Sequence, residues 1–443
     1  MQAAGSWFGQ PKGLTVLFLT EMWEKFSFFG MRALQLYYMT KQLHFSQADA
    51  SLVYGAYAAG VYLTPIFGGI VADRWLGRRR AVITGGLLMA LGHFMMASEA
   101  LFFPAMAMIA VGNGLFLPSL PSQIALLYPD GDLRRVSAYN VYYVGVNLGA
   151  LLAPLICGTL GEVYGWHYGF GAAGIGMCAG LLIYLGGSRH LPRDAAGSPE
   201  PAATAVMPGG PRRIAMLAAV ALAVIVFRSA YEQTGNTLAV WTDASVDRAS
   251  FGALIPATWF QSLNPLFVFL FSPILVAMWN RRAARGLAVP DLPRMAWGAS
   301  GVALAYALLA GVIALGTPGA LAHWGWLVAF YALFTLGELY ILPVGLGLFA
   351  RLAPGGFGST TIAAWFLASF AGNLLSGVVG TWWEALGAGG FFSLMAVVCL
   401  CAGGMLVVIG RLVRRPIDMR HVGLVPSKGQ AAASRHGPRR PPG

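Results

Sequence analysis

Residues 14–38 of the chain read LTVLFLTEMWEKFSFFGMRALQLYY. This apolar run exceeds the roughly 20 residues that a helix rising about 1.5 Å per residue needs to cross a bilayer. Four charged residues interrupt it, namely Glu21, Glu24, Lys25 and Arg32. Each would cost roughly 2.5–3.5 kcal/mol at the bilayer centre if it faced lipid. The run therefore predicts a membrane-spanning helix whose charges face the interior of a bundle.

The spacing of these charges predicts that they lie along one face of the helix. At about 100° per residue, four side chains share a stripe and Glu24 lies on its shoulder; the four are Glu21, Lys25, Phe28 and Arg32. The charges can therefore pair and face an aqueous cavity. The alternative is a static ion-pair lock between helices. We favour an ion or substrate path, because ionisable residues inside membranes usually mark one.

The composition of the whole chain places it in a membrane. Of its 443 residues, 57% are apolar and 10% are charged, more apolar surface than a soluble domain can bury. The apolar runs are too long for barrel strands, so the spans must be helices. The net charge of +12 lies in short connections and in the tail without a basic aromatic face, which argues against nucleic acid as a partner.

The apolar runs predict an all-α membrane protein with twelve transmembrane helices in two six-helix bundles. The first six spans lie near residues 13–38, 50–72, 81–100, 102–127, 136–158 and 168–187, and the second six near 214–242, 255–279, 295–315, 324–350, 359–380 and 391–413. The N-terminal bundle thus comprises residues 1–187 and the C-terminal bundle 214–413. Residues 188–213 are rich in Pro, Gly, Ala and Arg, which predicts a linker. Residues 414–443 are polar and basic, which predicts a disordered tail.

Arginines occur in alternate connections between the spans. They are Arg74, Arg78, Arg79, Arg80, Arg134, Arg135, Arg281, Arg282, Arg285, Arg351, Arg411, Arg414 and Arg415, together with those of the linker. Because cytoplasmic connections carry the excess of Lys and Arg, both termini, the linker and the tail are expected in the cytoplasm. Two six-span halves are also what a transporter needs whose solute site lies at the midplane between them. A bacterial inner membrane fits the short connections.

Two later spans carry charges as well. Arg228 and Glu232 lie one helical turn apart in the seventh span, so they can form an ion pair. Glu338 in the tenth span has no cation nearby in the sequence, so its partner must come from another helix or from a ligand. The alternative for Glu338 is a protonated carboxyl group bonded to a tyrosine or a backbone carbonyl.

A set of motifs resembles one transporter family. EMWEKFSFFG at residues 21–30 resembles the ExxERFxYYG motif of the proton-dependent oligopeptide transporters, a family of the major facilitator superfamily. YYVGVNLG at residues 142–149 is similar to the fifth-span motif of that family. Further matches follow in family order: Glu232-Gln233, FQSLNP at 260–265, Gly337-Glu338, PVGL at 343–346 and Trp365-Phe366. The resemblance implies the major facilitator fold and proton-coupled symport of di- and tripeptides by alternating access.

The segment GIVADRWLGRR at residues 69–79 resembles the superfamily's loop between spans two and three, which helps gate the cytoplasmic side. The residues that carry this match are Gly69, Asp73, Arg74, Gly77 and Arg78. By resemblance, proton coupling involves four residues, Glu21, Glu24, Lys25 and Glu232. Lys25 stands where the family motif has arginine, which keeps the positive charge but not the planar set of hydrogen-bond donors of a guanidinium group.

The resemblance also implies a substrate site. Arg32 would hold the peptide carboxylate, and Asn147 and Glu338 would receive the free amino terminus. Tyr62 and Trp365 would line the cavity. Phe28 and Phe29 replace two tyrosines of the motif, which removes two hydroxyls from that wall.

The largest departure from the family lies in the fourth span, where the family has a lysine before proline and this chain has Leu117. In the family that lysine lies opposite the seventh-span acid, which here is Glu232. One turn earlier, where the family usually has tryptophan, this chain has Arg228. Our hypothesis is that Arg228 supplies the charge lost at position 117. It would pair with Glu232 when no solute is bound and help to hold the solute carboxylate otherwise.

Other functions remain as alternatives. A transporter of the same family for a non-peptide or anionic solute is the first, because the changes at Leu117 and Arg228 alter the pocket. A channel would also place polar groups in the spans, but two halves with a gating loop favour alternating access. An intramembrane enzyme is disfavoured because the sequence has no HExxH or GxSxG motif. We expect no cofactor besides protons, no metal, a lipid bilayer around the chain, and a monomer.

Overall fold

The computed structural model describes residues 9–129, 132, 134–192, 211–250, 252–287, 289–317, 319–351 and 358–414. Within these residues, ten helical stretches are long and apolar enough to cross a membrane. Helices α1 (Lys12–Lys41) and α3 (Arg78–Met95) are long enough too, but their charged residues set them apart from the ten. With these two, the described chain contains the twelve predicted spans.

The N-terminal half consists of α1, α2, α3, α4, α5 and α6. Their bounds, beyond those given, are α2 Gln47–Val71, α4 Phe102–Ala125, α5 Arg134–Ala153 and α6 Trp166–Gly187. Short π-helical segments extend two of them, at Ala72–Leu76 after α2 and at Pro154–Gly158 and Leu160–Tyr164 after α5. Gly77 has φ 77°, a left-handed conformation that glycine adopts without strain, and it turns the chain into α3.

The C-terminal half consists of α7 to α13. Its helices are α7 Pro211–Tyr231, α8 Thr237–Ser245, α9 Leu263–Ala284, α10 Asp291–Leu315, α11 Gly325–Arg351, α12 Gly358–Gly380 and α13 Trp383–Arg414. A 3₁₀ turn, Glu232–Gly235, joins α7 to α8, so these two form one span. The last span begins earlier than predicted, because α13 runs through a bend at Gly387. Short strands in the connections pair β1 (Val246–Asp247) with β4 (Ala322–His323) and β2 (Ala249–Ser250) with β3 (Ala253–Leu254).

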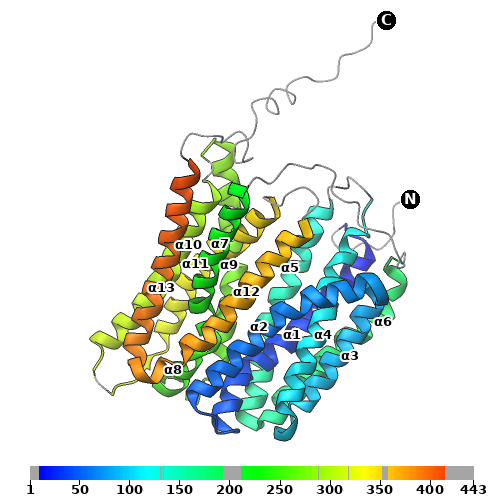
Figure 1. Ribbon diagram of the computed structural model, residues 1–443. Helices are drawn as coiled ribbons and strands as arrows, with labels where there is room; N and C mark the ends of the chain where they lie inside the picture. The colour runs from blue at the N-terminus through cyan, green and yellow to red at the C-terminus, as the bar shows by residue number, and fades with distance from the viewer. Residues whose placement is uncertain are drawn as a thin grey trace, which may run out of the picture.

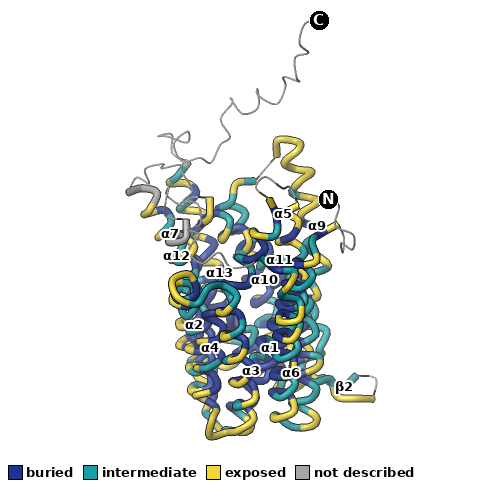
Figure 2. The backbone as a smooth tube through the Cα atoms, turned by 90° about the vertical axis from the view of Figure 1, so that its right-hand side faces the viewer, coloured by how far each residue is buried: buried dark blue, intermediate teal, exposed yellow. Residues whose placement is uncertain are grey.

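The two halves lie side by side, with α2 and α12 next to each other where they meet (Figure 1). Each half has its own hydrophobic core. The C-terminal core includes Tyr306, Phe330 and Phe334, all nearly inaccessible. Large apolar side chains such as Leu182 and Ile274 are exposed on the outside, as expected of a surface that faces lipid, and the buried residues run along the inside (Figure 2).

Glycines allow the helices to pack closely. A Cβ atom at Gly68 of α2 would lie 2.1 Å from the carbonyl oxygen of Gly114 in α4, and one at Gly55 would lie 2.5 Å from the Cα of Gly377 in α12. Small residues are typical of membrane helix interfaces for this reason. The contact of Gly55 with Gly377 brings the two halves together near one end of the bundle.

Polar contacts join the halves at that same end. Ser51 donates to Oδ1 of Asn236 at 2.8 Å, and the Lys41 ammonium lies 2.7 Å from the carboxylate of Asp243. The Glu162 carboxylate accepts hydrogen bonds from backbone N–H groups of the opposite half. We call this end the closed end. The arginine-rich end is the opposite one, because α2 runs from the closed end at Gln47 toward the arginines that begin α3.

The predicted linker and tail lie largely outside the described residues. Helix α6 ends at Gly187 and α7 begins at Pro211. Residues 193–210 and 415–443 belong to the part of the chain that the structure does not describe, so the predictions for residues 188–213 and 414–443 stay predictions.

Candidate functional site

One buried carboxylate is shared by two arginines between the halves. Arg228 Nη2 donates to Oε1 of Glu232 at 2.8 Å, and Arg32 donates to Oε2 of the same carboxylate. Glu232 is 2% exposed and Arg228 is 4% exposed. The predicted pair of Arg228 with Glu232 is therefore confirmed. Because Arg32 belongs to α1 and Glu232 follows α7, their ion pair also joins the two halves.

This cluster carries an excess of positive charge. Two guanidinium groups face one carboxylate, and phenol groups accompany them. The hydroxyl of Tyr54 accepts hydrogen bonds from Nε and Nη2 of Arg32 at 2.9 and 2.7 Å. The guanidinium of Arg228 lies 4.7 Å from the ring centroid of Tyr62, a cation–π contact. The remaining positive charge suits a solute carboxylate better than a cation.

Tyr54 was not predicted from the sequence, although it is 1% exposed and bonds directly to Arg32. No motif marks it, and only the packing of α2 against α1 brings it to the guanidinium. Asn264 was not singled out for the site either, yet it donates a hydrogen bond to the carboxylate of Glu338. Its place in the FQSLNP segment was the available signal.

Glu338 of α11 is bound by neutral donors. The hydroxyl of Tyr231 donates to Oε1 at 2.8 Å, and Asn264 Nδ2 donates to Oε2 at 2.5 Å. Both partners come from other helices and both are neutral, so the contact with a tyrosine that the alternative expected is present, and the protonation of the carboxyl group stays a prediction. Tyr231 directly precedes Glu232 in the chain. The two carboxylates are thus linked through consecutive residues of one span. Glu232 is held by cations, whereas no cation among the described residues is bound to Glu338.

Glu21 and Glu24 of α1 form a separate cluster with Lys25 inside the N-terminal half. Lys25 Nζ lies 2.6 Å from Oε2 of Glu24 and 3.4 Å from Oε1 of Glu21. Both carboxylates are nearly inaccessible, and the ammonium lies 5.9 Å from the ring centroid of Phe28. The predicted stripe is therefore divided: Glu21 and Lys25 pair as expected, but Arg32 turns to Glu232. One cation here serves two carboxylates, the reverse of the Glu232 cluster.

The aromatic residues predicted for the cavity are placed differently from one another. Tyr62 contacts Arg228, and its ring lies 6.3 Å from that of Phe366. Trp365 lies instead in the core of the C-terminal half, 5.3 Å from the ring of Phe349. The structure thus brings Phe366, rather than Trp365, to the cluster. Because consecutive residues point to different faces of a helix, only one of Trp365 and Phe366 can face the cluster, and the motif alone does not say which.

The contacts that the structure shows for three other predicted residues lie away from the two arginines and Glu232. Asn147 is buried and donates to the backbone oxygen of Tyr143 in its own helix, at 3.0 Å. Phe28 and Phe29 pack edge to face within α1, with ring centroids 5.3 Å apart. Their roles in substrate binding stay predictions.

The predicted gating loop lies at the arginine-rich end. Asp73 and Arg74 belong to the π-helical segment after α2, Gly77 makes the turn, and Arg78 begins α3. Gly69 lies on the face of α2 that packs against Pro118 of α4. No group of His, Cys, Asp or Glu suited to a metal ion occurs among the residues that the structure describes.

Known proteins resemble this chain along most of its length. The sequence profile of the POT family matches residues 79–208 and 200–391. The peptide transporter YePEPT of Yersinia enterocolitica is 32% identical over 85% of this chain and 88% of its own length. A di-/tripeptide transporter of Lactococcus lactis subsp. cremoris is 31% identical over 91% of this chain and 96% of its own.

Solved structures agree with these sequence relatives. The crystal structure of a peptide transporter POT in complex with sulfate superposes with a TM-score of 0.86, at 29% identity, covering 93% of this chain and 96% of that one. The predicted major facilitator architecture of twelve helices in two bundles is thereby confirmed.

Proposed function

The chain belongs to the POT family of membrane transporters, and we propose that it is a proton-coupled symporter of di- and tripeptides that works by alternating access. The observation that carries the proposal is the Glu232 carboxylate, which is buried between Arg32 and Arg228. Tyr231, the residue before it, donates a hydrogen bond to the second carboxylate, Glu338. This arrangement offers cations for one end of a peptide and a carboxylate for the other.

The solute binds between the two kinds of group. Its carboxylate is drawn to the guanidinium groups of Arg32 and Arg228, which together outnumber the single carboxylate they share. Planar guanidinium groups suit this role because they donate two parallel hydrogen bonds to a carboxylate. The ammonium end binds Glu338, whose present donors, Tyr231 and Asn264, are neutral. Asn147 assists at this end, as the family resemblance implies.

Proton coupling follows from competition for Glu232. A proton on this carboxylate removes the charge that holds both arginines and frees them for the solute. A solute carboxylate that engages the arginines in turn leaves Glu232 open to protonation. The coupling is reciprocal, so the solute binds more tightly as the external pH falls. Glu232 is our first choice for the transported proton, with Glu21 and Glu24 after it.

Alternating access uses the same ion pair. Arg32 and Glu232 join the two halves, and their separation lets one half rock against the other around the central site. The close packing of α2 on α12 and the hydrogen bonds of Gln47 with Gly380 and of Ser51 with Asn236 shut the closed end in this state. With the arginine-rich end in the cytoplasm of a bacterial cell, as the positive-inside rule indicates, this state is closed on the outer side. Both termini are then cytoplasmic, and the chain acts as a monomer.

The test is uptake into proteoliposomes under an imposed inward proton gradient, with a panel of dipeptides, tripeptides and inorganic anions. Peptide uptake that collapses when the gradient is dissipated supports the proposal. Gradient-driven uptake of anions without peptides would favour the alternative solute class. Current in the absence of any solute would favour a channel. Glu232→Gln tests the proton-coupling role of this residue, because it keeps the side-chain shape and removes the titrating charge.

A further inference from the structure

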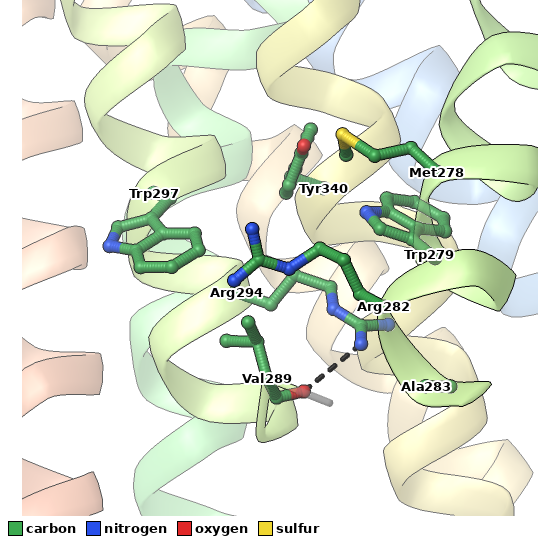
Figure 3. A pocket seen from close by; sticks show the side chains of 8 residues that line it. All are labelled: Met278, Trp279, Arg282, Ala283, Val289, Arg294, Trp297 and Tyr340. Carbon is green, nitrogen blue, oxygen red and sulfur yellow. Dashed lines mark hydrogen bonds between the residues drawn. The ribbon is translucent and has the colours of Figure 1, made fainter. Parts of the chain in front are cut away.

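A second cluster of arginines lines a groove on the outer surface of the C-terminal half, at the arginine-rich end. The groove lies between α9 and α10, with Tyr340 of α11 as its floor, and encloses about 160 Å³ (Figure 3). Its walls carry Trp279 and Arg282 from α9 and Arg294 and Trp297 from α10. These residues do not contribute to the Glu232 cluster.

Two guanidinium groups enter this groove from opposite walls (Figure 3). Arg294 Nη2 donates to the backbone oxygen of Val289 at 3.0 Å, and its guanidinium lies 4.9 Å from the ring centroid of Trp279. The Nε of Arg294 is buried and has no hydrogen-bond partner among the residues that the structure describes. Arg282 reaches in from α9 toward the same space. Within the described residues the side chain of Arg282 makes no hydrogen bond, so its donors are left for a ligand beside the guanidinium of Arg294.

No described carboxylate neutralises these two cations. Asp291, one turn before Arg294 in α10, is instead paired with Arg351 of α11. Within the described residues, neither Arg282 nor Arg294 forms an ion pair. Two cations that share a partly enclosed, tryptophan-lined space repel each other unless an anion lies between them. The groove thus has the charge and the open donors of an anion site.

The surroundings indicate which anion. Trp297 is 57% exposed and Met278 is 37% exposed, so the groove opens on the outer flank of the bundle, where apolar side chains face lipid. Tryptophans and arginines at a helix end are typical of the membrane interface. Basic pockets between transmembrane helices on the cytoplasmic side bind anionic headgroups. We propose that this groove binds the phosphodiester headgroup of an anionic membrane lipid.

In the bound state the phosphate oxygens accept hydrogen bonds from Arg282 and Arg294, and the acyl chains leave along Met278 and Trp297. Guanidinium groups and phosphate match in bidentate geometry, which makes arginine the preferred cation for this contact. The headgroup bridges α9 and α10 over α11, two residues from Glu338. The lipid thereby stabilises the packing of three helices of the C-terminal half.

The experiment compares two double variants with equal loss of charge. Arg282→Gln with Arg294→Gln alters the groove, whereas Arg281→Gln with Arg285→Gln alters exposed arginines at the same helix end that do not line it. The purified full chain is titrated in mild detergent with phosphatidylglycerol, phosphatidylcholine or inorganic phosphate. Bound lipid is counted by intact-mass spectrometry, and the thermal midpoint is recorded in parallel. Arg282→Gln alone serves if the double groove variant does not fold, because Arg282 is exposed.

We expect the native chain and the control variant to retain phosphatidylglycerol in preference to phosphatidylcholine. The groove variant should bind phosphatidylglycerol at least about tenfold more weakly, because the loss of even one charge-assisted hydrogen bond weakens binding about tenfold. Equal retention by the groove and control variants would overturn the site. Equal binding of the two lipids, or stabilisation by inorganic phosphate alone, would overturn the assignment to an anionic lipid.

Discussion

Because two arginines share one carboxylate, substitutions at Arg228 and at Glu232 should differ in their effects on transport and stability. Arg228→Ala removes one of two cations, and Glu232 keeps its ion pair with Arg32. Glu232→Gln removes the only carboxylate that the described residues place between two guanidinium groups. The first variant should therefore impair transport more than stability, and the second should impair both.

The sizes follow from what each change leaves unpaired. Loss of the 2.8 Å contact from Arg228 removes one charge-assisted hydrogen bond, worth about 1.5–3 kcal/mol. The hydrogen bond that Arg228 would donate to the solute carboxylate is of the same kind, so its loss should weaken solute binding about tenfold to 150-fold. Glu232→Gln leaves buried charge without compensation, which costs about 3–5 kcal/mol. Combining Arg228→Ala with Glu232→Gln leaves only Arg32, so the double variant should be more stable than Glu232→Gln alone.

The assay has two parts. Thermal unfolding in detergent ranks the three variants, and proteoliposomes report proton-driven uptake beside counterflow, which needs no gradient. Arg411→Ala is the control, because Arg411 is an exposed arginine at the end of α13. We expect Arg228→Ala to lose proton-driven uptake. Unchanged proton-driven transport in that variant would refute the relocation of the cation, and a double variant no more stable than Glu232→Gln would refute the shared carboxylate.

Three further predictions concern other parts of the site. Glu338→Gln should weaken the binding of dipeptides about tenfold, because one hydrogen bond to a charged group is lost, and should leave the binding of N-acetylated dipeptides unchanged. Equal losses of affinity for both in competition uptake would contradict the role of Glu338 at the amino terminus. In the native chain, solute affinity measured by competition should rise as external pH falls. In Glu232→Gln the affinity should not depend on pH, and a pH dependence that survives this change would assign the proton to another group. Gly55→Val should hinder closure of α2 on α12, because a Cβ atom there would lie 2.5 Å from Gly377 and overpacking costs about 1–3 kcal/mol; Gly60→Val, with nothing near its Cβ position, is the control, and equal uptake by both would argue against closure at this contact.

The sequence alone determined the solvent and the architecture of this protein. In lipid, apolar runs of about 20 residues must form helices, because only then do all their backbone N–H and C=O groups find hydrogen-bond partners. The number of these runs predicted the two bundles. Spacing of four along a helix also determined the pairs of Arg228 with Glu232 and of Lys25 with Glu21, because such residues lie one turn apart whatever the tertiary structure.

Only the tertiary structure decided which charges meet across helices. Arg32 lies on the stripe of Glu21 and Lys25, yet its long side chain reaches Glu232 in the other half, about 200 residues along the chain. Tyr54 and Asn264 joined the site through the packing of α2 and α9, which no local pattern encodes. The same holds for the groove of Arg282 and Arg294, whose charges remain open because the nearby Asp291 turns to Arg351. Helix periodicity determines which face a side chain occupies, whereas the partner across that face depends on how distant helices pack.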